Sequence, residues 1–265
     1  VGRMFLAGVI PGIVLALAFS LMIVAMAIWW PSVIGGAQRS ADVARAETWA
    51  TATVKLVPIA ALILLVLGGL YSGLFTPTEA GAVGAAGALV IALVRRRLDW
   101  PKLWRVLVET GHVSVSVLFL VLAASLYSRM LALTGLPASI TEAVTQMGLG
   151  PYGFLFVYIL IVVALGCIID SVSIMLIMLP IVLPIARAFE MDIIWFGVIT
   201  VVAVEIGLLT PPFGISVYTV KATLNDKTIT VKDIFSGAFP FVVCMTAVLG
   251  LLVIFPSWST WLARM

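Results

Sequence analysis

Long apolar runs alternate with short polar segments along most of this chain. The runs cover roughly residues 4–30, 56–75, 76–94, 113–133, 152–188, 193–220 and 235–261. An α-helix rises 1.5 Å per residue, so about 20 apolar residues cross the hydrocarbon core of a bilayer. Several runs reach that length. The pattern therefore predicts an all-α membrane protein, a polytopic helical bundle with short connections.

Composition supports the same class. Hydrophobic residues make up 63% of the chain and charged residues 10%, whereas soluble domains carry about 25% charged residues. The net charge of +3 requires no nucleic-acid partner, because the basic residues lie in short loops. Both cysteines, Cys167 and Cys244, fall inside apolar runs and are predicted to be small buried hydrophobes rather than disulfide partners.

Basic residues predict the orientation. We place the loops at 35–55, 95–105 and 221–233 on the cytoplasmic side, where they hold 11 of the 15 Lys and Arg residues. The other four are Arg3, Arg129, Arg187 and Arg264. This asymmetry follows the positive-inside rule. It also requires the apolar segment 152–188 to enter and leave the membrane on one side, as a re-entrant helical hairpin. A single tilted and kinked helix is the alternative.

The centre of segment 152–188 is polar, with Asp170, Ser171 and Ser173 close together. A carboxylate deep in a bilayer costs a few kcal/mol and commonly marks an ion or substrate pathway. Asp170 is therefore a candidate sodium ligand at the hairpin tip. It is equally well placed as the N-cap of the helix that follows, and the sequence leaves both roles open.

The apolar run 193–220 is interrupted at its middle by "GLLTPPFGIS". Proline inside a helix removes a donor and clashes with the preceding turn, at a cost of about 3 kcal/mol. A break there leaves carbonyls that attract cations and amides that suit anions. We therefore predict a discontinuous transmembrane helix with binding groups at the break, with a simple proline kink as the alternative. The residues that cannot all lie in one continuous helix are Gly207, Thr210, Pro211, Pro212, Gly214 and Ser216.

A short internal repeat links the two ends of the chain. Aligning Pro11 with Pro240 also aligns Gly8 with Gly237, and in the predicted topology the two helices run in opposite directions, as in inverted repeats. The chain also starts with Val1, which suggests a fragment. We expect four parts: residues 1–32 as the last helix of a preceding repeat that is missing, 33–134 as scaffold and arm helices, 135–222 as a transport domain with the hairpin and broken helix, and 223–265 as the terminal transmembrane helix.

The segment "TPTEAGAVGAAGA" has a structural explanation. Thr76 and Glu79 are spaced as a capping box, and Gly81, Gly84 and Gly87 form a small-residue face for helix packing.

The sequence carries no motif of a zinc enzyme or an ATPase. It has one histidine, no HExxH and no GxxxxGK[ST], so no zinc site or ATPase is predicted. Asp170 has no evident acid or nucleophile partner. We therefore expect no enzyme and no cofactor.

Three motifs in order, "GLYSGLFTPTEAGAVGA", "IIDSVSIMLIMLPIVLPIA" and "GLLTPPFGISVYTVKA", resemble the large membrane subunit of TRAP (tripartite ATP-independent periplasmic) transporters, in its C-terminal portion. The resemblance covers essentially all of residues 1–265. It implies one half of an inverted-repeat, elevator-type transporter of the ion-transporter superfamily in the bacterial inner membrane. It further implies symport of an organic anion (a carboxylate or a sialic-acid-like compound) with sodium. The implied partners are a small membrane subunit and a periplasmic substrate-binding protein. A stand-alone carboxylate/sodium symporter of the same superfamily is the alternative.

By position, the resemblance assigns ion and substrate binding to the hairpin tip and the helix break. The assigned residues are Asp170, Ser171, Ser173, Gly207, Thr210, Pro211, Pro212, Gly214 and Ser216, with Asp170, Ser171, Gly207 and Thr210 as the sodium candidates. Two positions depart from the family pattern. Ser171 and Val172 follow Asp170 where many relatives have Pro-Thr, and Phe213 stands where a small aliphatic residue is common.

Overall fold

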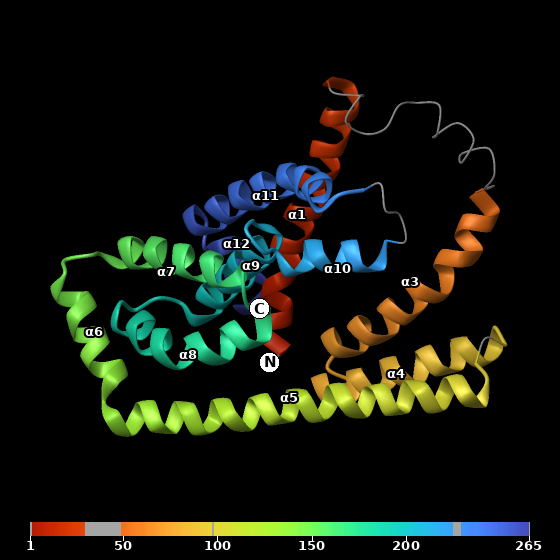
Figure 1. Ribbon diagram of the computed structural model, residues 1–265, viewed down its shortest axis with the longest axis horizontal. Coiled ribbons are helices and arrows are strands. Elements are labelled where there is room, and N and C mark those ends of the chain that lie inside the picture. The colour runs from red at the N-terminus through yellow and green to blue at the C-terminus, as the bar shows by residue number, and fades with distance from the viewer. Residues whose placement is uncertain (1, 30–48, 97, 225–228, 265) are drawn as a thin grey trace. The chain divides into compact units, whose positions relative to one another are not determined.

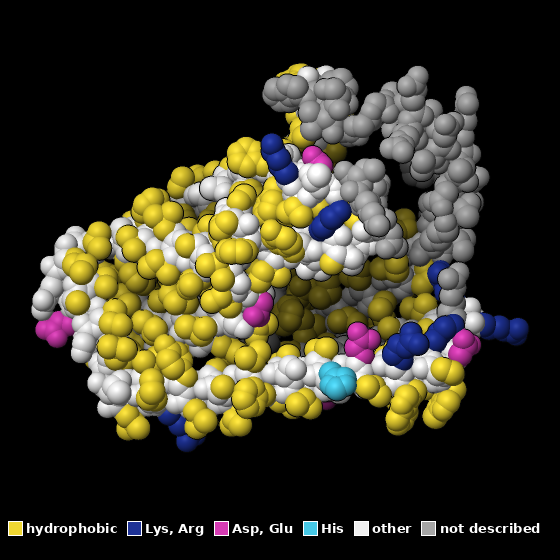
Figure 2. Space-filling view, viewed as in Figure 1, with side chains coloured by type: hydrophobic (Ala, Val, Ile, Leu, Met, Phe, Trp, Pro, Cys, Tyr) yellow, Lys and Arg dark blue, Asp and Glu magenta, His cyan; other side chains and the backbone are white. Residues whose placement is uncertain are grey.

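The computed structural model describes residues 2–29, 49–96, 98–224 and 229–264. These residues form α-helices joined by turns, with no β-strand among them, as the sequence predicts. Most of the predicted polar segment at 35–53 and part of the loop at 221–233 lie outside the described residues. Hydrophobic side chains cover much of the visible surface (Figure 2), which suits contact with lipid or with other apolar protein surfaces.

Five helices in the described part of the chain are long and apolar enough to cross a membrane, judged by length and composition. They are α1 (Gly2–Trp29), α4 (Pro77–Val94), α5 (Trp100–Thr134), α8 (Ser171–Ala188) and α11 (Val231–Ile254). The other helices are α3 (Trp49–Tyr71), α6 (Leu136–Gln146), α7 (Pro151–Gly166), α9 (Ile193–Leu209), α10 (Ile215–Thr223) and α12 (Ser257–Arg264) (Figure 1).

The chain divides into two compact units, described separately. Unit 1 comprises residues 1–6 and 23–115, and unit 2 comprises residues 7–22 and 116–265. In unit 1, helices α3 and α4 pack against each other. The turn between them ends in the predicted capping box, in which the Thr76 hydroxyl accepts the Glu79 amide and the Glu79 carboxylate accepts the Thr76 amide.

Small residues let α3 and α4 approach closely. A Cβ on Gly87 would lie 2.6 Å from Leu62 Cδ1, and a Cβ on Gly84 would lie 3.1 Å from Val66 Cγ2. The predicted packing face is thus confirmed at these two glycines. Gly81 differs, because a Cβ there would meet no atom within 4 Å.

The structure corrects three predicted element boundaries. The apolar run predicted at 113–133 is only part of one continuous helix, α5, which begins at Trp100 and has 35 residues. After Pro101 no proline interrupts it, and Gly111 costs only about 1 kcal/mol in a helix. The predicted loop after residue 134 contains helix α6. The last span, expected to reach residue 261, ends at Ile254, because Pro256 cannot continue the helix and a separate helix, α12, follows.

Helix α9 forms the core of unit 2. It contacts α7, α8, α10, α11 and α12, and all its residues except Thr200 and Glu205 are apolar or glycine, as expected for a largely buried helix. Its buried residues are Trp195, Phe196, Val198, Ile199, Thr200, Val202, Ala203, Val204, Ile206, Gly207 and Leu208. This core holds the ends of the neighbouring helices in fixed positions, which matters for the site described next.

Polar contacts join α9 to its neighbours at two levels. Near its start, Trp195 Nε1 donates a 2.8 Å hydrogen bond to the Leu252 carbonyl of α11. One turn further on, the Tyr158 hydroxyl of α7 lies 3.0 Å from Thr200 Oγ1. The Tyr158 ring stacks on Phe196 with centroids 4.9 Å apart. Both bonds satisfy buried polar groups, so they fix how α7 and α11 sit on α9.

Candidate ion and substrate site

Helices α7 and α8 form a helical hairpin whose turn comprises residues 167–170 (Figure 1). The hairpin form agrees with the sequence prediction. That it is re-entrant in a membrane stays a prediction. The turn brings two opposite helix ends together: α7 finishes at Gly166 and α8 begins at Ser171.

Asp170 is the N-cap of α8. Its Oδ1 accepts hydrogen bonds from the amides of Val172 and Ser173, both at 3.1 Å, and its Oδ2 accepts the Ser173 hydroxyl. The capping role predicted as one possibility is therefore present. The Asp170 side chain remains exposed, so its carboxylate keeps lone pairs that the cap does not use.

The double proline breaks the next helix, as predicted. Helix α9 ends at Leu209, residues 210–214 are non-helical, and α10 begins at Ile215. The Pro211–Pro212 peptide bond is cis. Because a proline nitrogen carries no hydrogen, the carbonyls of Gly207 and Leu208 cannot receive their usual bonds from residues 211 and 212.

Local contacts replace part of what the prolines remove. The Thr210 amide donates to the Gly207 carbonyl at 2.9 Å, and Thr210 Oγ1 donates to the Ile206 carbonyl at 2.6 Å. Thr210 itself is extended, with φ −93° and ψ 138°. The last turn of α9 is therefore tightened, and its remaining carbonyls form a negative helix end.

The hairpin turn and the helix break meet directly. The Gly214 amide donates a 3.1 Å hydrogen bond to the Cys167 carbonyl. In a continuous helix that amide would bond to the Thr210 carbonyl instead. The Cys167 thiol lies within hydrogen-bond distance of two carbonyl oxygens, that of Pro211 at 3.4 Å and that of Val163 in its own helix at 3.3 Å. Two non-helical segments from distant parts of the sequence thus bond to each other.

A glycine contact brings α7 and α9 together immediately before these segments. A Cβ on Gly166 would lie 2.8 Å from Gly207 Cα, and a Cβ on Gly207 would lie 2.6 Å from the Val163 carbonyl oxygen. Only glycine fits at either position. Gly207 was predicted to bind an ion, and the structure shows that its missing side chain serves helix packing.

Four helix ends therefore gather at one place. The C-terminal ends of α7 and α9 carry partial negative charge, and the N-terminal ends of α8 and α10 carry partial positive charge. The first pair suits a small cation held by carbonyl oxygens, and the second pair suits an oxyanion.

The predicted residues occupy different places in this arrangement. Thr210, Pro211 and Gly214 lie in the break that bonds to the hairpin turn, whereas the hydrogen bonds of the Asp170 and Ser173 side chains to described residues stay within the start of α8. Ser216 lies half-buried in the first turn of α10, Ser171 is half-buried at the start of α8, and Pro212 is exposed. Sequence reasoning placed Cys167 in the core, where it is 5% exposed, but missed its two bonds to the break.

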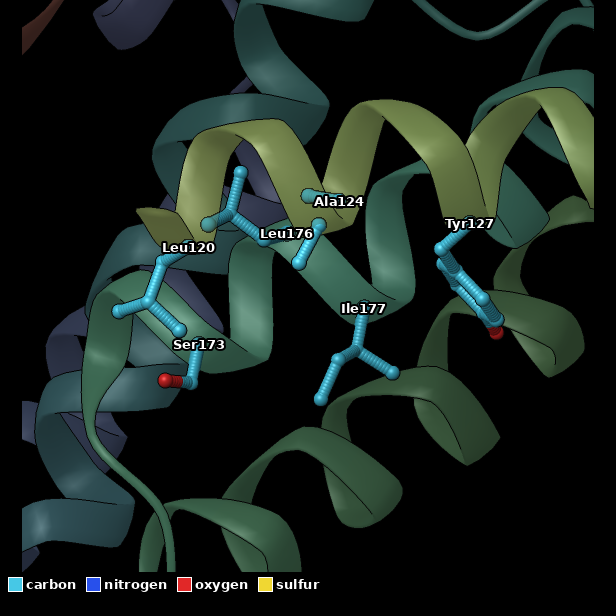
Figure 3. Close-up of a pocket in the computed structure, with 7 residues that line it drawn as sticks. Leu120, Ala124, Tyr127, Ser173, Leu176 and Ile177 are labelled. Atoms are coloured by element: carbon cyan, nitrogen blue, oxygen red, sulfur yellow. The ribbon is translucent and has the colours of Figure 1, made fainter. Parts of the chain in front are cut away.

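Two spaces adjoin the site. A cavity of about 200 Å³ lies between α5 and α8 (Figure 3). Leu120, Ala124 and Tyr127 face it from α5, and Ser173, Leu176 and Ile177 face it from α8. Ser173 is the residue whose hydroxyl bonds to Asp170, so this cavity reaches the hairpin tip.

The second space is an open groove of about 670 Å³ beside the break. It is lined by Ile168, Phe213, Ile215, Tyr218, Thr219 and Ala222. Phe213, which departs from the family pattern, is 55% exposed there. A side chain at this position therefore contributes to the wall of the groove rather than to the packing of the break.

Glu205 is an acidic exception on the core helix. It and Val201, one turn earlier, are exposed, whereas Val204 and Ile206 are buried. Among the described residues, the Glu205 carboxylate makes no hydrogen bond or ion pair. One narrow face of α9 is thus open and carries a charge.

The chain matches the family described as "Tripartite ATP-independent periplasmic transporter, DctM component" over residues 1–258. It is 34% identical over 225 residues to the C4-dicarboxylate TRAP transporter large permease protein DctM of Pseudomonas aeruginosa, covering 84% of this chain and 51% of that protein. The protein of the same description in Rhodobacter capsulatus is 33% identical, covering 98% of this chain and 57% of the relative. The 2,3-diketo-L-gulonate TRAP transporter large permease protein YiaN of Escherichia coli is 28% identical, covering 97% of this chain and 59% of that protein. The chain therefore spans between half and three fifths of the length of these relatives.

Proposed function

Because the chain belongs to the DctM component family of tripartite ATP-independent periplasmic transporters, we propose that it carries half of the binding site of a sodium-coupled large permease subunit. The family and the five apolar helices make it a multi-pass protein of the bacterial inner membrane, and a transport protein rather than an enzyme. The transported compound is a small organic anion, delivered by a periplasmic substrate-binding protein. A small membrane subunit completes the complex.

The hydrogen bond between the Gly214 amide and the Cys167 carbonyl is the observation that carries this proposal. It brings two interrupted apolar segments to one point. Non-helical backbone at membrane depth is tolerated only where protein or a water-filled cavity supplies partners. A transporter requires such a place, because a substrate and an ion must bind there reversibly.

Charge at the helix ends supports an anion and a cation together. Sodium binds at the carbonyl ends of α7 and α9, with Thr210 Oγ1 and the free lone pairs of Asp170 as further oxygen ligands. The substrate carboxylate binds toward the starts of α8 and α10. The named substrates of the relatives, C4-dicarboxylates and 2,3-diketo-L-gulonate, belong to this class of organic anion.

Packing around α9 supports an elevator-type movement. Helices α7, α8 and α10 all contact α9, and the hairpin turn bonds to the break, so the binding groups belong to one packed body. A body of this kind carries its site across the membrane as a unit, as in alternating access by rigid-body motion.

The test is uptake into proteoliposomes that hold the complete large permease and the small subunit, with the binding protein outside. We expect uptake of a radiolabelled dicarboxylate to require an inward sodium gradient, and Thr210→Val to raise the half-saturating sodium concentration about tenfold. Thr246→Val is the matched control, since Thr246 Oγ1 makes the same kind of bond to its own helix, in α11. Uptake independent of sodium would refute the coupling. Full uptake without binding protein would favour a stand-alone symporter.

A further inference from the structure

We infer that Cys167 is a positioning residue that couples the cation-binding and anion-binding ends of the site. This inference rests on the proposed function and adds how the two ligands influence each other. Cys167 stands at the end of α7 and bonds to both sides of the helix break. Within the described part of the chain, no other residue of the hairpin turn bonds to a residue distant in the sequence.

The two bonds of Cys167 reach opposite sides of the break. Its thiol sulfur lies 3.4 Å from the Pro211 carbonyl oxygen, which follows the negative end of α9, and 3.3 Å from the Val163 carbonyl oxygen of its own helix, so the one S–H is shared between these two acceptors. Its carbonyl accepts the Gly214 amide, which precedes the positive end of α10. A shift at either side of the break is therefore transmitted to the other through this one residue.

Burial makes the backbone bond between Gly214 and Cys167 hard to replace with water. Cys167 is 5% exposed, and Gly214 is also buried. A buried donor or acceptor that loses its partner pays its desolvation penalty in full. The start of α10 is therefore better held in this arrangement than in one where the Gly214 amide moves away from the hairpin turn.

Close packing restricts the alternatives further. Gly166 and Gly207 are in backbone contact immediately before the junction, so the last turns of α7 and α9 cannot slide past each other freely. Gly214 has φ +46°, and a Cβ there would lie 2.8 Å from the Phe235 ring. The N-terminal end of α10 is thus confined from both sides.

The consequence is thermodynamic linkage between the two ligands. Sodium at the carbonyl ends of α7 and α9 stabilises the arrangement in which Cys167 holds the break. The same arrangement fixes the start of α10, where the anion binds. Each ligand therefore favours the conformation that the other requires, and the coupling is reciprocal.

The test uses Cys167 variants of the complete permease and measures how strongly sodium lowers the substrate KM. Cys167→Val keeps an apolar side chain of similar volume and removes the thiol donor. Cys167→Ser keeps a donor. We expect the factor by which sodium lowers the KM to fall about three- to tenfold in Cys167→Val and to recover in Cys167→Ser.

Cys244→Val in α11 is the control, because Cys244 is a half-buried free thiol outside the junction. It should leave the sodium effect on KM unchanged. An unchanged sodium effect in Cys167→Val, with sodium-dependent uptake by the wild type, would overturn this inference alone. A wild type whose uptake ignores sodium would overturn the proposed function.

Discussion

Gly166 of α7 and Gly207 of α9 cross with no space for a side chain at either position. A Cβ on Gly207 would lie 2.6 Å from the Val163 carbonyl oxygen and 2.7 Å from Gly166 Cα. Both the Val163 carbonyl oxygen and Gly166 Cα are backbone atoms, which cannot move aside as the end of a flexible side chain can. This crossing sets the spacing between the hairpin and the broken helix, so the geometry of the whole site depends on it.

We predict that Gly207→Ala destabilises the protein by about 1–3 kcal/mol, the usual range for overpacking, and abolishes uptake. Thermal unfolding in detergent and the proteoliposome assay measure the two effects. Gly250→Ala is the control, because a Cβ at Gly250 of α11 meets no atom within 4 Å and alanine favours a helix. Equal unfolding temperatures for Gly207→Ala and wild type would contradict the contact.

Substitutions at Asp170 distinguish its role as the N-cap of α8 from its proposed role as a sodium ligand. Asparagine is as good an N-cap as aspartate, whereas alanine costs about 1 kcal/mol at this position. Asp170→Asn should therefore keep the thermal stability of wild type but lose sodium dependence, because it removes the negative charge. Asp170→Ala should lose both thermal stability and the sodium dependence of uptake. If Asp170→Asn transports with unaltered sodium dependence, Asp170 is a cap and nothing more.

The Asp192 carboxylate should stabilise the folded protein to an extent that depends on pH. It caps α9 through the amides of Ile194 and Trp195 and accepts a 2.6 Å bond from Arg264 of α12. Partial burial raises the pKa of the Asp192 carboxyl. The bond from Arg264 and the amide donors lower it by more, so the pKa lies below its ordinary value.

A carboxyl whose folded-state pKa is lowered stabilises the fold above its unfolded pKa, near 3.9. That contribution is lost as the pH falls through the lowered value. The Arg264 side chain is 68% exposed, so the ion pair contributes less than about 1 kcal/mol. We expect Arg264→Gln to lower the unfolding temperature slightly at pH 7 and the difference to vanish as the pH falls through the lowered pKa of Asp192. A difference that persisted in acid would exclude the ion pair as its cause.

The buried Tyr158–Thr200 pair should respond unequally to its two single substitutions. Thr200 Oγ1 donates to the Phe196 carbonyl at 2.8 Å, so the Tyr158 hydroxyl donates to Thr200. Tyr158→Phe leaves the Thr200 hydroxyl still bonded and should cost about 1 kcal/mol.

Thr200→Val leaves the Tyr158 hydroxyl buried without an acceptor and should cost about 1–3 kcal/mol. The double variant should be more stable than Thr200→Val alone, which a double-mutant cycle of unfolding measures. Strictly additive losses would show that the two side chains do not interact.

Several features of the fold were predictable because their causes are local. Pro211 and Pro212 lack the hydrogen that a helix needs, so the break had to fall beside them. Thr76 and Glu79 formed a capping box because both groups lie within one turn. Where local signals were weak, prediction was wrong. Residues 100–134 contain no strong helix stop after Pro101, and one continuous helix extends the run expected at 113–133 back to Trp100.

The order of apolar runs along the chain was enough to establish an all-helical membrane protein with a hairpin and an interrupted helix, because run length and proline position act within a few residues. It did not show that Cys167 bonds to the break or that Gly166 contacts Gly207. Cys167 and Pro211 are 44 residues apart, and their contact follows from how α7 packs on the buried helix α9. Close packing leaves few ways to place those surfaces together, and it selects which helix ends share the site.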